Sequence, residues 1–405
     1  MYPENWKFSK LEDAVEKIID YRGKTPKKTN FGIPLITAKI VKDGFIQEPQ
    51  EFIGYDDYDV WMVRGLPQKG DVILTMEAPL GEVAQITNER VALAQRLVAI
   101  RGHKEILDNT YLKYFFISNL GQSVLKQRET GTTVTGIKQS ELRKIVIPLP
   151  PLPEQRAIAD VLSALDDKIE LNRRINHTLE QLARALFKHM FIDNQERAGW
   201  EEAPLGDDFQ LTMGQSPPGS TYNEIGEGMP FFQGRADYGF RYPTNRVYCT
   251  APTRFANAGD TLVSVRAPVG DINMAMENCA IGRGVAAIRH KSDSRSFTYY
   301  QMLNIQNDFK NFEMEGTVFG SINKDSFHNL KYSRPPFNLI LDFEKNCSPI
   351  DQQIEINIKQ NKTLAELRDT LLPRLMSGQV RVKPIVTTAL DANTDERLIE
   401  VNDEA

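Results

Sequence analysis

The sequence predicts an α+β chain in which two related mixed α/β domains are joined by two long helices that pair as an antiparallel intramolecular coiled coil. Three observations predict this architecture: an internal repeat, two apolar seams with heptad spacing, and a proline-rich junction before each seam. The chain has 405 residues, a length typical of two or three domains. Hydrophobic residues make up 41% of it, which is enough to fill real cores.

The repeat relates the first half of the chain to the second. Residues 70–81 return as 259–270, and both segments begin with Gly-Asp and end with Ala-Pro-x-Gly. Residues 165–186 align without a gap to 350–371 and share 9 of 22 identities, where roughly one or two would arise by chance at ordinary composition. The period is far longer than that of a solenoid, so a duplicated domain is the better description.

The first part of each copy has the pattern of a mixed α/β domain. Short runs rich in β-branched and apolar residues predict strands at 72–75, 97–100, 261–265 and 285–288. Apolar residues at helical spacing predict helices over 109–127 and 296–311. The aromatic residues in these helical segments fit packing beneath a sheet better than stacking on bases.

Prolines at 148–153 and 335–336 separate each domain from the helix that follows, because such runs continue neither sheet nor helix. The first long helix is predicted over about 154–191 and would span roughly 57 Å. Steps of three and four residues mark the predicted coiled-coil seam: Leu162, Leu165, Ile169, Asn172, Asn176, Leu179 and Leu186 in the first copy, and Ile350, Ile354, Asn357, Asn361, Leu364 and Leu371 in the second. The asparagines are expected to fix the register of the pair at some cost in stability.

These patterns divide the chain into five regions. We expect a first domain at 1–150, a central spacer helix at 151–195, a second domain at 196–336 and a C-terminal spacer helix at 337–380. Residues 381–405 form an acidic tail that we expect to be disordered, with six acidic residues and one basic residue from 385 onward. That difference of −5 equals the net charge of the whole chain, so the remainder is neutral.

Composition also excludes several classes of protein. No run of 18 apolar residues is present, and the first residues lack the basic-then-apolar pattern of a signal peptide. The three cysteines, Cys249, Cys279 and Cys347, form no CxxC pair, which argues against a disulfide framework or a structural zinc site. A cytoplasmic location fits these features best.

Two similar domains on a rigid spacer suit a ligand with two separated sites. Double-stranded DNA is such a ligand, because equivalent faces recur about every 34 Å along it. The candidate DNA-binding residues are basic or amide side chains in predicted loops. They are Arg22, Lys24, Lys27, Lys28, Lys39, Gln95, Arg96 and Lys138 in the first domain, and Gln233, Arg235, Arg241, Arg246, Arg254 and Arg283 in the second.

No catalytic or metal site is predicted. Gly282-Arg-Gly284 begins a GxGxxA pattern, but a β-like run follows it where a cofactor loop needs a helix. Arg334-Pro-Pro-Phe resembles an amino-methyltransferase motif, but arginine has no acceptor for the base amine. Gly23-Lys-Thr25 lacks the first glycine of a P-loop, and the five histidines do not cluster at metal spacing.

Several segments closely resemble the specificity subunits of type I restriction–modification systems. They are Gly-Thr-Thr-Val-Thr-Gly-Ile (131–137), Ile-Pro-Leu-Pro-Pro-Leu-Pro-Glu-Gln-Arg (147–156), Leu-Asp-Asp-Lys-Ile-Glu-Leu-Asn (165–172), Val-Arg-Ala-Pro-Val-Gly-Asp (265–271) and Gly-Arg-Gly-Val-Ala-Ala-Ile-Arg (282–289). The second copy departs from the pattern at 338–346, where the Leu-Pro-Glu-Gln-Arg stretch is replaced.

The resemblance implies a non-catalytic subunit with two target recognition domains, each reading one half of a split, asymmetric double-stranded DNA target. It also implies that the helices dock two modification (methyltransferase) subunits, with restriction subunits in the full complex. S-adenosylmethionine, ATP and Mg²⁺ are then expected in the partner subunits and no cofactor in this chain. The alternative from the residues alone is a DNA-independent coiled-coil scaffold whose duplicated domains bind proteins.

Overall fold

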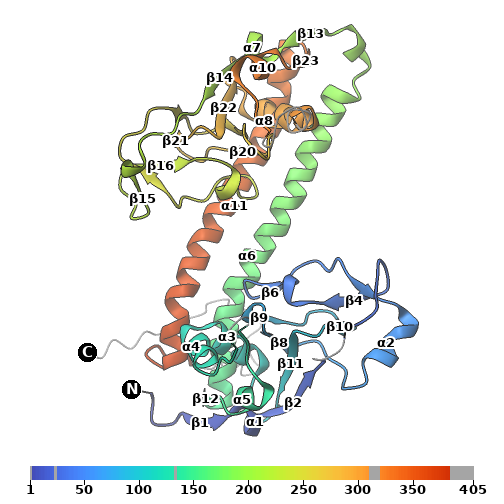
Figure 1. Ribbon diagram of the computed structural model, residues 1–405, viewed down its shortest axis with the longest axis vertical. Coiled ribbons are helices and arrows are strands. Elements are labelled where there is room, and N and C mark those ends of the chain that lie inside the picture. The colour runs from blue at the N-terminus through green and yellow to red at the C-terminus, as the bar shows by residue number, and fades with distance from the viewer. Residues whose placement is uncertain (1, 22–24, 132–134, 310–319, 384–405) are drawn as a thin grey trace, which may run out of the picture. The chain divides into compact units, whose positions relative to one another are not determined.

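The computed structural model describes residues 2–21, 25–131, 135–309 and 320–383. The chain forms two compact units. Unit 1 comprises Met1–Glu170 and Asn361–Ala405, and unit 2 comprises Leu171–Gln360. Two long helices, α6 (Leu152–Phe187) and α11 (Phe337–Ser377), each contribute a part to both units. Figure 1 labels the elements of each unit.

The main sheet of unit 1 has the strand order β2-β11-β8-β9, and every neighbouring pair is antiparallel. Its strands are β2 (Val15–Asp20), β8 (Val72–Met76), β9 (Leu80–Gln85) and β11 (Leu97–Gly102). A ribbon of β1 (Lys7–Lys10) and β12 (Val146–Leu149) flanks it, with α1 (Leu11–Ala14) and α5 (Gln139–Arg143). The strands predicted at 72–75 and 97–100 are therefore confirmed, and they pair with each other.

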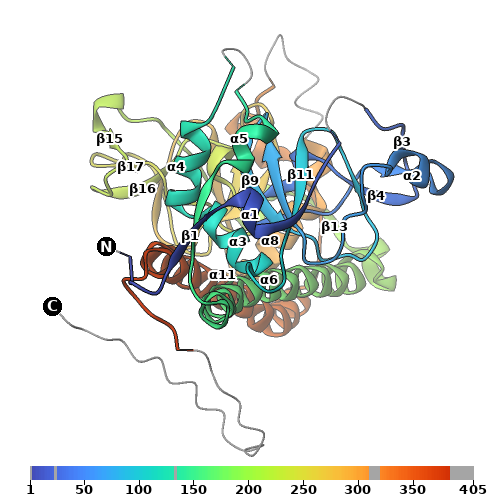
Figure 2. The ribbon, with the colours of Figure 1, turned by 90° about the horizontal axis from the view of Figure 1, so that it is seen from below.

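A second, smaller sheet in unit 1 has the order β10-β4-β7-β3. Its strands are β3 (Lys28–Thr29), β4 (Ile33–Ile36), β7 (Phe52–Ile53) and β10 (Ala92–Leu93), and β4 and β10 run parallel. A short hairpin, β5 (Val41–Lys42) and β6 (Phe45–Ile46), and helix α2 (Tyr55–Trp61) complete this part. In Figure 2 the small sheet and α2 lie on one side of the main sheet, and α3 (Asn109–Ile117) and α4 (Asn119–Gln127) lie on the other.

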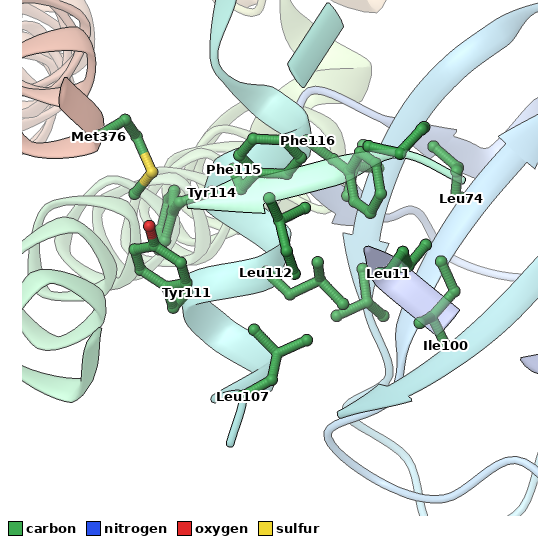
Figure 3. Close-up of a cluster of buried hydrophobic side chains, with 14 of the residues drawn as sticks. Leu11, Leu74, Ile100, Leu107, Tyr111, Leu112, Tyr114, Phe115, Phe116 and Met376 are labelled. Atoms are coloured by element: carbon green, nitrogen blue, oxygen red, sulfur yellow. The ribbon is translucent and has the colours of Figure 1, made fainter. Parts of the chain in front are cut away.

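Alternation along β8 explains this layering. Leu74 points into a cluster with the helices, whereas the neighbouring Ile73 belongs to the cluster beneath the small sheet. Figure 3 shows the helical cluster: Met376 reaches from α11 toward Tyr111 and Tyr114 of α3. The side chains of Ile73, Leu74, Tyr111, Tyr114 and Met376 are all almost fully buried. Helix α11 therefore forms part of the core of this unit.

Unit 2 repeats the main sheet strand for strand, whereas its smaller sheet has five strands instead of four. Its main sheet has the order β14-β22-β19-β20, again entirely antiparallel, and its smaller sheet has the order β15-β17-β16-β21-β18. The main strands are β14 (Phe209–Met213), β19 (Thr261–Ser264), β20 (Ile272–Met274) and β22 (Val285–His290). The smaller ones are β15 (Tyr222–Asn223), β16 (Met229–Phe232), β17 (Tyr248–Cys249), β18 (Phe255–Ala256) and β21 (Cys279–Ile281).

The remaining elements of unit 2 also match those of unit 1. β13 (Glu201–Pro204) pairs with β23 (Lys331–Arg334), as β1 pairs with β12. The helices are α7 (Leu205–Asp208), α8 (Arg295–Asn304) and α10 (Lys324–Asn329). Aromatic side chains dominate this core: Phe187 of α6 packs on Phe343 of α11 with ring centroids 5.5 Å apart, and both belong to the cluster that holds Phe297 of α8.

One predicted helix is wrong in its extent. The segment 109–127 forms two helices because Ser118 adopts an extended backbone, and its hydroxyl accepts a hydrogen bond from the amide of Gly121 at the start of α4. Gly121 lies so close to the backbone of Phe115 that a Cβ there would meet the Phe115 carbonyl oxygen at 2.1 Å. In the second copy, α8 ends at Asn304, and positions 310 and 311 of the prediction lie outside the described residues.

Within each unit the two long helices run antiparallel. In unit 1 the amide of Asn361 donates to the carbonyl of Ile169 (3.4 Å), and Arg368 pairs with Asp166 (2.8 Å). In unit 2 Asn172 donates to Gln360 (2.9 Å), and Asn357 donates to Asn176 (2.8 Å). As one partner number rises, the other falls, which defines an antiparallel pair.

All thirteen predicted seam residues are buried or half-buried. Other apolar residues of the same helices, such as Leu171, Leu182 and Ile356, are exposed instead. Within the described ranges, no helix is both long and apolar enough to cross a membrane.

Candidate nucleic-acid interface

In unit 1 the ends of several strands converge at one edge of the two sheets. The amide of Ala94, just after β10, donates to the carbonyl of Ile36 at the end of β4 (2.9 Å). The amide of Met76 at the end of β8 donates to the carbonyl of Arg96 (2.8 Å), and the amide of Ile137 donates to the carbonyl of Met76 (3.0 Å). These hydrogen bonds bring together four segments that are far apart in the sequence.

The same three hydrogen bonds recur in unit 2. Gly282, just after β21, donates to the carbonyl of Phe232 at the end of β16 (2.8 Å). Val265 after β19 donates to Gly284 (2.9 Å), and Ile322 donates to Val265 (3.1 Å). The same backbone frame, defined by these three hydrogen bonds, therefore occurs in both units and carries different side chains in each.

We call the side chains that these converging segments carry the strand-end surface of each unit. In unit 1 it consists of Lys39, Glu77, Gln95, Arg96 and Lys138. In unit 2 it consists of Gln233, Arg235, Arg254, Arg266 and Arg283. None of these ten side chains is buried. Arg254 joins the surface because its carbonyl accepts from the amide of Ile281 at the end of β21 (3.0 Å).

The two surfaces differ in charge. In unit 1 the Glu77 carboxylate lies 3.8 Å from Nε of Arg96, and the hydroxyl of Thr25 donates to Oε1 of Gln95 (3.2 Å). Lys39 and Lys138 are exposed beside them, so three bases stand against one acid. This surface is polar and mildly basic, with both donors and acceptors available to a ligand.

The strand-end surface of unit 2 carries basic and amide side chains only. Arg235 pairs with Asp271 (2.6 Å), which ties its guanidinium to the turn after β19. Among the residues that the structure describes, Arg254, Arg266 and Arg283 make no ion pair. Three exposed guanidinium groups at one edge can bind phosphate oxygens or base edges, because each offers five N–H donors.

Two glycines allow the backbone before β22 to lie close to the backbone of Gln233. A Cβ on Gly284 would lie 2.3 Å from the carbonyl oxygen of Gln233, and a Cβ on Gly282 would lie 3.0 Å from its Cα. Strand β22 begins directly after Gly284. The Gly-Arg-Gly sequence therefore serves close backbone packing, which places Arg283 beside Gln233.

A matched ion pair supports the strand that precedes each turn. Arg101 of β11 donates from Nε and Nη2 to Asp71 (both 2.8 Å), and Arg289 of β22 donates from Nε to Asp260 (2.5 Å). Both aspartates are buried and belong to the repeated Gly-Asp motif. The hydrogen bond to Asp71 raises the pKa of Arg101, so this cation stays charged. The Gly-Asp motif thus has a structural role in both units.

Arg241 must be removed from the predicted set of DNA-binding residues. Its side chain is fully buried and pairs with Asp351 (2.7 Å), Glu180 and the hydroxyl of Tyr300 (2.6 Å). Burial acts to lower its pKa, but Tyr299, Asp351 and the other neighbouring groups outweigh burial and raise it. A side chain without solvent access cannot contact DNA, and sequence alone did not reveal its buried partners.

Other predicted residues lie elsewhere or outside the described residues. Lys27 and Lys28, at β3, are exposed and lie close to acids, Asp57 at 3.8 Å and Glu51 at 2.8 Å. Arg246 is exposed and pairs with two acids, Asp237 (2.9 Å) and Glu224 (3.2 Å). Arg22 and Lys24 lie outside the described residues.

Sequence reasoning missed two members of the strand-end surface, Glu77 and Arg266. Both precede the Ala-Pro dipeptide of the repeated turn, and both Ala-Pro peptide bonds are cis. The signal was present in the alignment of 70–81 with 259–270, because this position changes from an acid to a base inside an otherwise similar motif.

Comparison with known proteins places the chain in a family. The sequence matches the family described as Type I restriction modification DNA specificity domain over residues 3–181 and 197–364, one match for each copy of the repeat. The chain belongs to this family. Recognition of the DNA target is the role of the family, which is non-catalytic.

Its relatives match most or nearly all of the chain. The putative type I restriction enzyme MjaX specificity subunit of Methanocaldococcus jannaschii is 30% identical, and the match covers 94% of this chain and 95% of the relative. The HindI specificity subunit of Haemophilus influenzae is 23% identical, with 77% and 87% covered. The type I S subunit from M. genitalium, a solved structure, is 18% identical with a TM-score of 0.63 over 92% and 96% of the two chains, which shows the shared fold.

Proposed function

We propose that each unit reads one half of a split, asymmetric DNA sequence through its strand-end surface, and that α6 and α11 set the spacing between the halves. The observation that carries this proposal is the pair of strand-end surfaces: one backbone frame, built twice, with different side chains. Two identical surfaces would read two identical half-sites. Different side chains on the same frame favour two different half-sites.

Both surfaces can contribute to DNA binding in two ways. Lys39 and Lys138 in unit 1 and Arg254 in unit 2 carry charges suited to phosphate oxygens, which position a protein on the duplex. Gln95 and Gln233 can each donate and accept, as a bidentate contact to adenine requires. Sequence selectivity then arises from amide and charged side chains that differ between the units.

The helices are suited to act as a ruler because each is continuous. Helix α6 has 36 residues and α11 has 41, so α6 is roughly 54 Å long at 1.5 Å per residue. The seam asparagines are hydrogen-bonded in both units, which favours a single register. A fixed register would hold the two half-sites at one separation.

A heptad deletion tests reading and spacing together. Segments 170–176 and 357–363 contain the paired seam asparagines, and removing both keeps the apolar seam in phase. The full chain, produced with its own modification subunits, should then methylate the same half-sequences with the gap shortened by about three base pairs. Sequencing of methylated bases in the host genome measures this result.

An insertion of seven residues at the same two places is the matched control, and it should lengthen the gap by a similar amount. An unchanged gap in both variants would disprove the ruler. A parent complex that methylates no preferred sequence would disprove DNA reading and favour a DNA-independent scaffold. Thermal unfolding of each purified variant confirms that it is folded before its methylation pattern is compared.

We also propose that the long helices dock two modification subunits. Leu171 and Leu182 of α6 are exposed, and so are Ile356 and Leu367, the residues that the repeat aligns with them on α11. The same apolar pair thus occurs on both helices, which suits two copies of one partner. Leu171→Glu with Ile356→Glu should reduce recovery of modification subunits with the tagged chain, whereas Lys362→Glu, a helix control, should not.

S-adenosylmethionine, ATP and Mg²⁺ would belong to the partner subunits, and restriction subunits would join them in the full complex. Because the family is non-catalytic, this chain would recognise the DNA sequence and its partner subunits would catalyse the reactions. We place this assembly in the cytoplasm, where its DNA substrate lies.

A further inference from the structure

The residue just before the Ala-Pro turn occupies the same backbone position in both units. It is Glu77 after β8 in unit 1 and Arg266 after β19 in unit 2. Met76 and Val265, the residues just before that position, each donate one backbone hydrogen bond and accept another from the strand-end segments. The position itself, Glu77 or Arg266, forms an isolated β-bridge, with Gly136 in unit 1 and Ser321 in unit 2. The backbone is therefore held on both sides.

The far side of each turn is held in the same way. In unit 1 the hydroxyl of Thr75 accepts from the amide of Glu82 (2.9 Å), and in unit 2 the hydroxyl of Ser264 accepts from the amide of Asp271 (2.8 Å). Both hydroxyl residues are buried. Such support fixes where a side chain starts, which is what recognition of a particular atom on a ligand requires.

The two side chains at this position have opposite chemistry. Arg266 is exposed and makes no ion pair within the described part of the chain. The Glu77 side chain is 43% exposed, and its carboxylate lies 3.8 Å from Arg96, beyond hydrogen-bonding distance. Each group therefore has hydrogen-bonding capacity that the described residues leave unused.

A carboxylate on this surface needs a specific reason. It repels the phosphate groups that Lys39, Arg96 and Lys138 would attract, so it weakens non-specific DNA binding. It becomes favourable against the amino group of cytosine, which donates to Glu in the major groove. An unpaired arginine at the matched position has the complementary preference, because it donates twice to O6 and N7 of guanine.

We infer that the residue preceding the Ala-Pro turn reads a base in both units: Glu77 reads a cytosine in one half of the target, and Arg266 reads a guanine in the other. This inference rests on the proposed function and adds the base class at one position of each half. It makes Glu77 and Arg266 specificity-determining residues.

The test uses the full chain assembled with its own modification subunits. First, methylation is measured on duplexes in which every position of both half-targets carries each of the four bases. Glu77→Ala should lower the preference for cytosine at one position of one half by about tenfold or more, and Arg266→Ala should do the same for guanine in the other half. All other positions should keep their preferences.

The salt dependence of DNA binding separates base reading from phosphate binding. If Arg266→Ala weakened binding to all duplexes equally and reduced the slope against log salt by about one unit, the arginine would be a phosphate contact and the inference would be wrong. If Glu77→Ala left every base preference unchanged, Glu77 would only position Arg96, and the inference would fail for unit 1.

A charge-reversal variant and two control variants sharpen the result. Glu77→Arg should create a new preference for guanine at the position where the parent prefers cytosine, which a merely structural residue would not do. Glu12→Ala on α1 and Lys331→Ala on β23 are exposed charge changes in the same units, outside the strand-end surface, and should change no preference. A parent complex without any sequence preference would instead refute the proposed function itself.

Discussion

The two units bury one matched carboxylate in different surroundings. In unit 1, Asp166 of α6 accepts from the hydroxyl of Tyr114 (2.7 Å) and pairs with Lys113 (3.5 Å) and Arg368 (2.8 Å). The repeat aligns Asp166 with Asp351 of α11 in unit 2. There the cation is Arg241, which comes from the loop between β16 and β17.

The difference shows how a duplicated core can diverge. Tyr300 keeps the position of Tyr114, with its hydroxyl 3.4 Å from Asp351, so the acid and the phenol survive in both units. In unit 1 the cations come from α3 and α11, which are themselves helices. In unit 2 the cation comes from a loop that also carries Arg235 of the strand-end surface, so that loop is anchored to both long helices through Glu180 and Asp351.

A second comparison concerns how each long helix holds the segment that opens the short helix. Gln155 of α6 accepts from the amide of Asp108, the residue that caps α3 (3.0 Å), and donates to Ile106 (2.9 Å). In unit 2, Glu344 of α11 accepts from the amides of Ser296 and Phe297 in the first turn of α8 (3.2 and 3.1 Å). The second copy lacks the Leu-Pro-Glu-Gln-Arg stretch, but Glu344 accepts hydrogen bonds from backbone amides at the start of α8, much as Gln155 does at the start of α3.

The largest effect that we expect follows removal of the buried arginine. Arg241→Ala leaves Asp351 buried without its cation and leaves Glu180 with only the exposed Arg184 (2.8 Å), so the free energy of unfolding of unit 2 should fall by about 3–5 kcal/mol. Urea denaturation of the full chain, followed by limited proteolysis that reports each unit, measures this loss.

Adding Glu180→Gln and Asp351→Asn to Arg241→Ala should recover part of that stability, because the buried charges are then gone. A loss below about 1 kcal/mol for Arg241→Ala alone would contradict a buried ion cluster in unit 2. The Arg241→Ala variant should also lose base selectivity at one half-target only, because the loop that carries Arg235 is no longer tied to Glu180 and Asp351.

The matched change in unit 1 should cost less. Arg368→Ala removes one charged hydrogen bond from Asp166, but Lys113 and Tyr114 remain on that carboxylate, so the expected loss is about 1.5–3 kcal/mol. Burial lowers the pKa of Lys113, whereas Asp166 raises it, so a second variant, Lys113→Met, tests the remaining cation. Equal losses from Arg368→Ala and Arg241→Ala would show that the two clusters do not differ as described.

The smallest effect that we expect is a difference in the pH dependence of stability between the units, because unit 2 has a buried histidine where unit 1 has a glycine. His290 of β22 is buried in unit 2, and the matched residue in unit 1 is Gly102. Burial lowers the pKa of His290 below its usual value of 6.5, partly opposed by Asp208, so the folded state binds its proton less readily than the unfolded state. Stability from this group is present above pH 6.5 and is lost as pH falls below it.

We therefore expect unit 2 to lose stability between pH 7 and pH 5 by more than unit 1 does. His290→Gln should reduce that pH dependence, and the measurement is urea denaturation across this range with the proteolytic readout for each unit. A pH profile that His290→Gln leaves unchanged would assign the effect to other groups.

Much of the fold could be predicted from the sequence, because the signals are local or repeated. Heptad spacing identified α6 and α11, and β-branched runs identified β8, β11, β19 and β22. The prediction over 109–127 missed the break at Ser118, because apolar spacing continues through it while tertiary packing at Gly121 favours two helices.

The candidate site could be predicted only in part. Basic loop residues such as Arg254 and Arg283 were predicted from their residue type alone, and the structure brings them to one edge through hydrogen bonds between distant strand ends. Arg241 has the same residue type and a similar loop position, but the structure buries it between two acids from α6 and α11.

The amino-acid sequence by itself determined that the chain is duplicated and that each copy ends in a helix with an apolar seam, because repeats and periodicity are written along the chain. Only the tertiary structure decided which charged side chains are buried and which reach solvent. That decision depends on pairing between residues such as Arg241 and Glu180, 61 positions apart, and linear spacing carries no record of such distances.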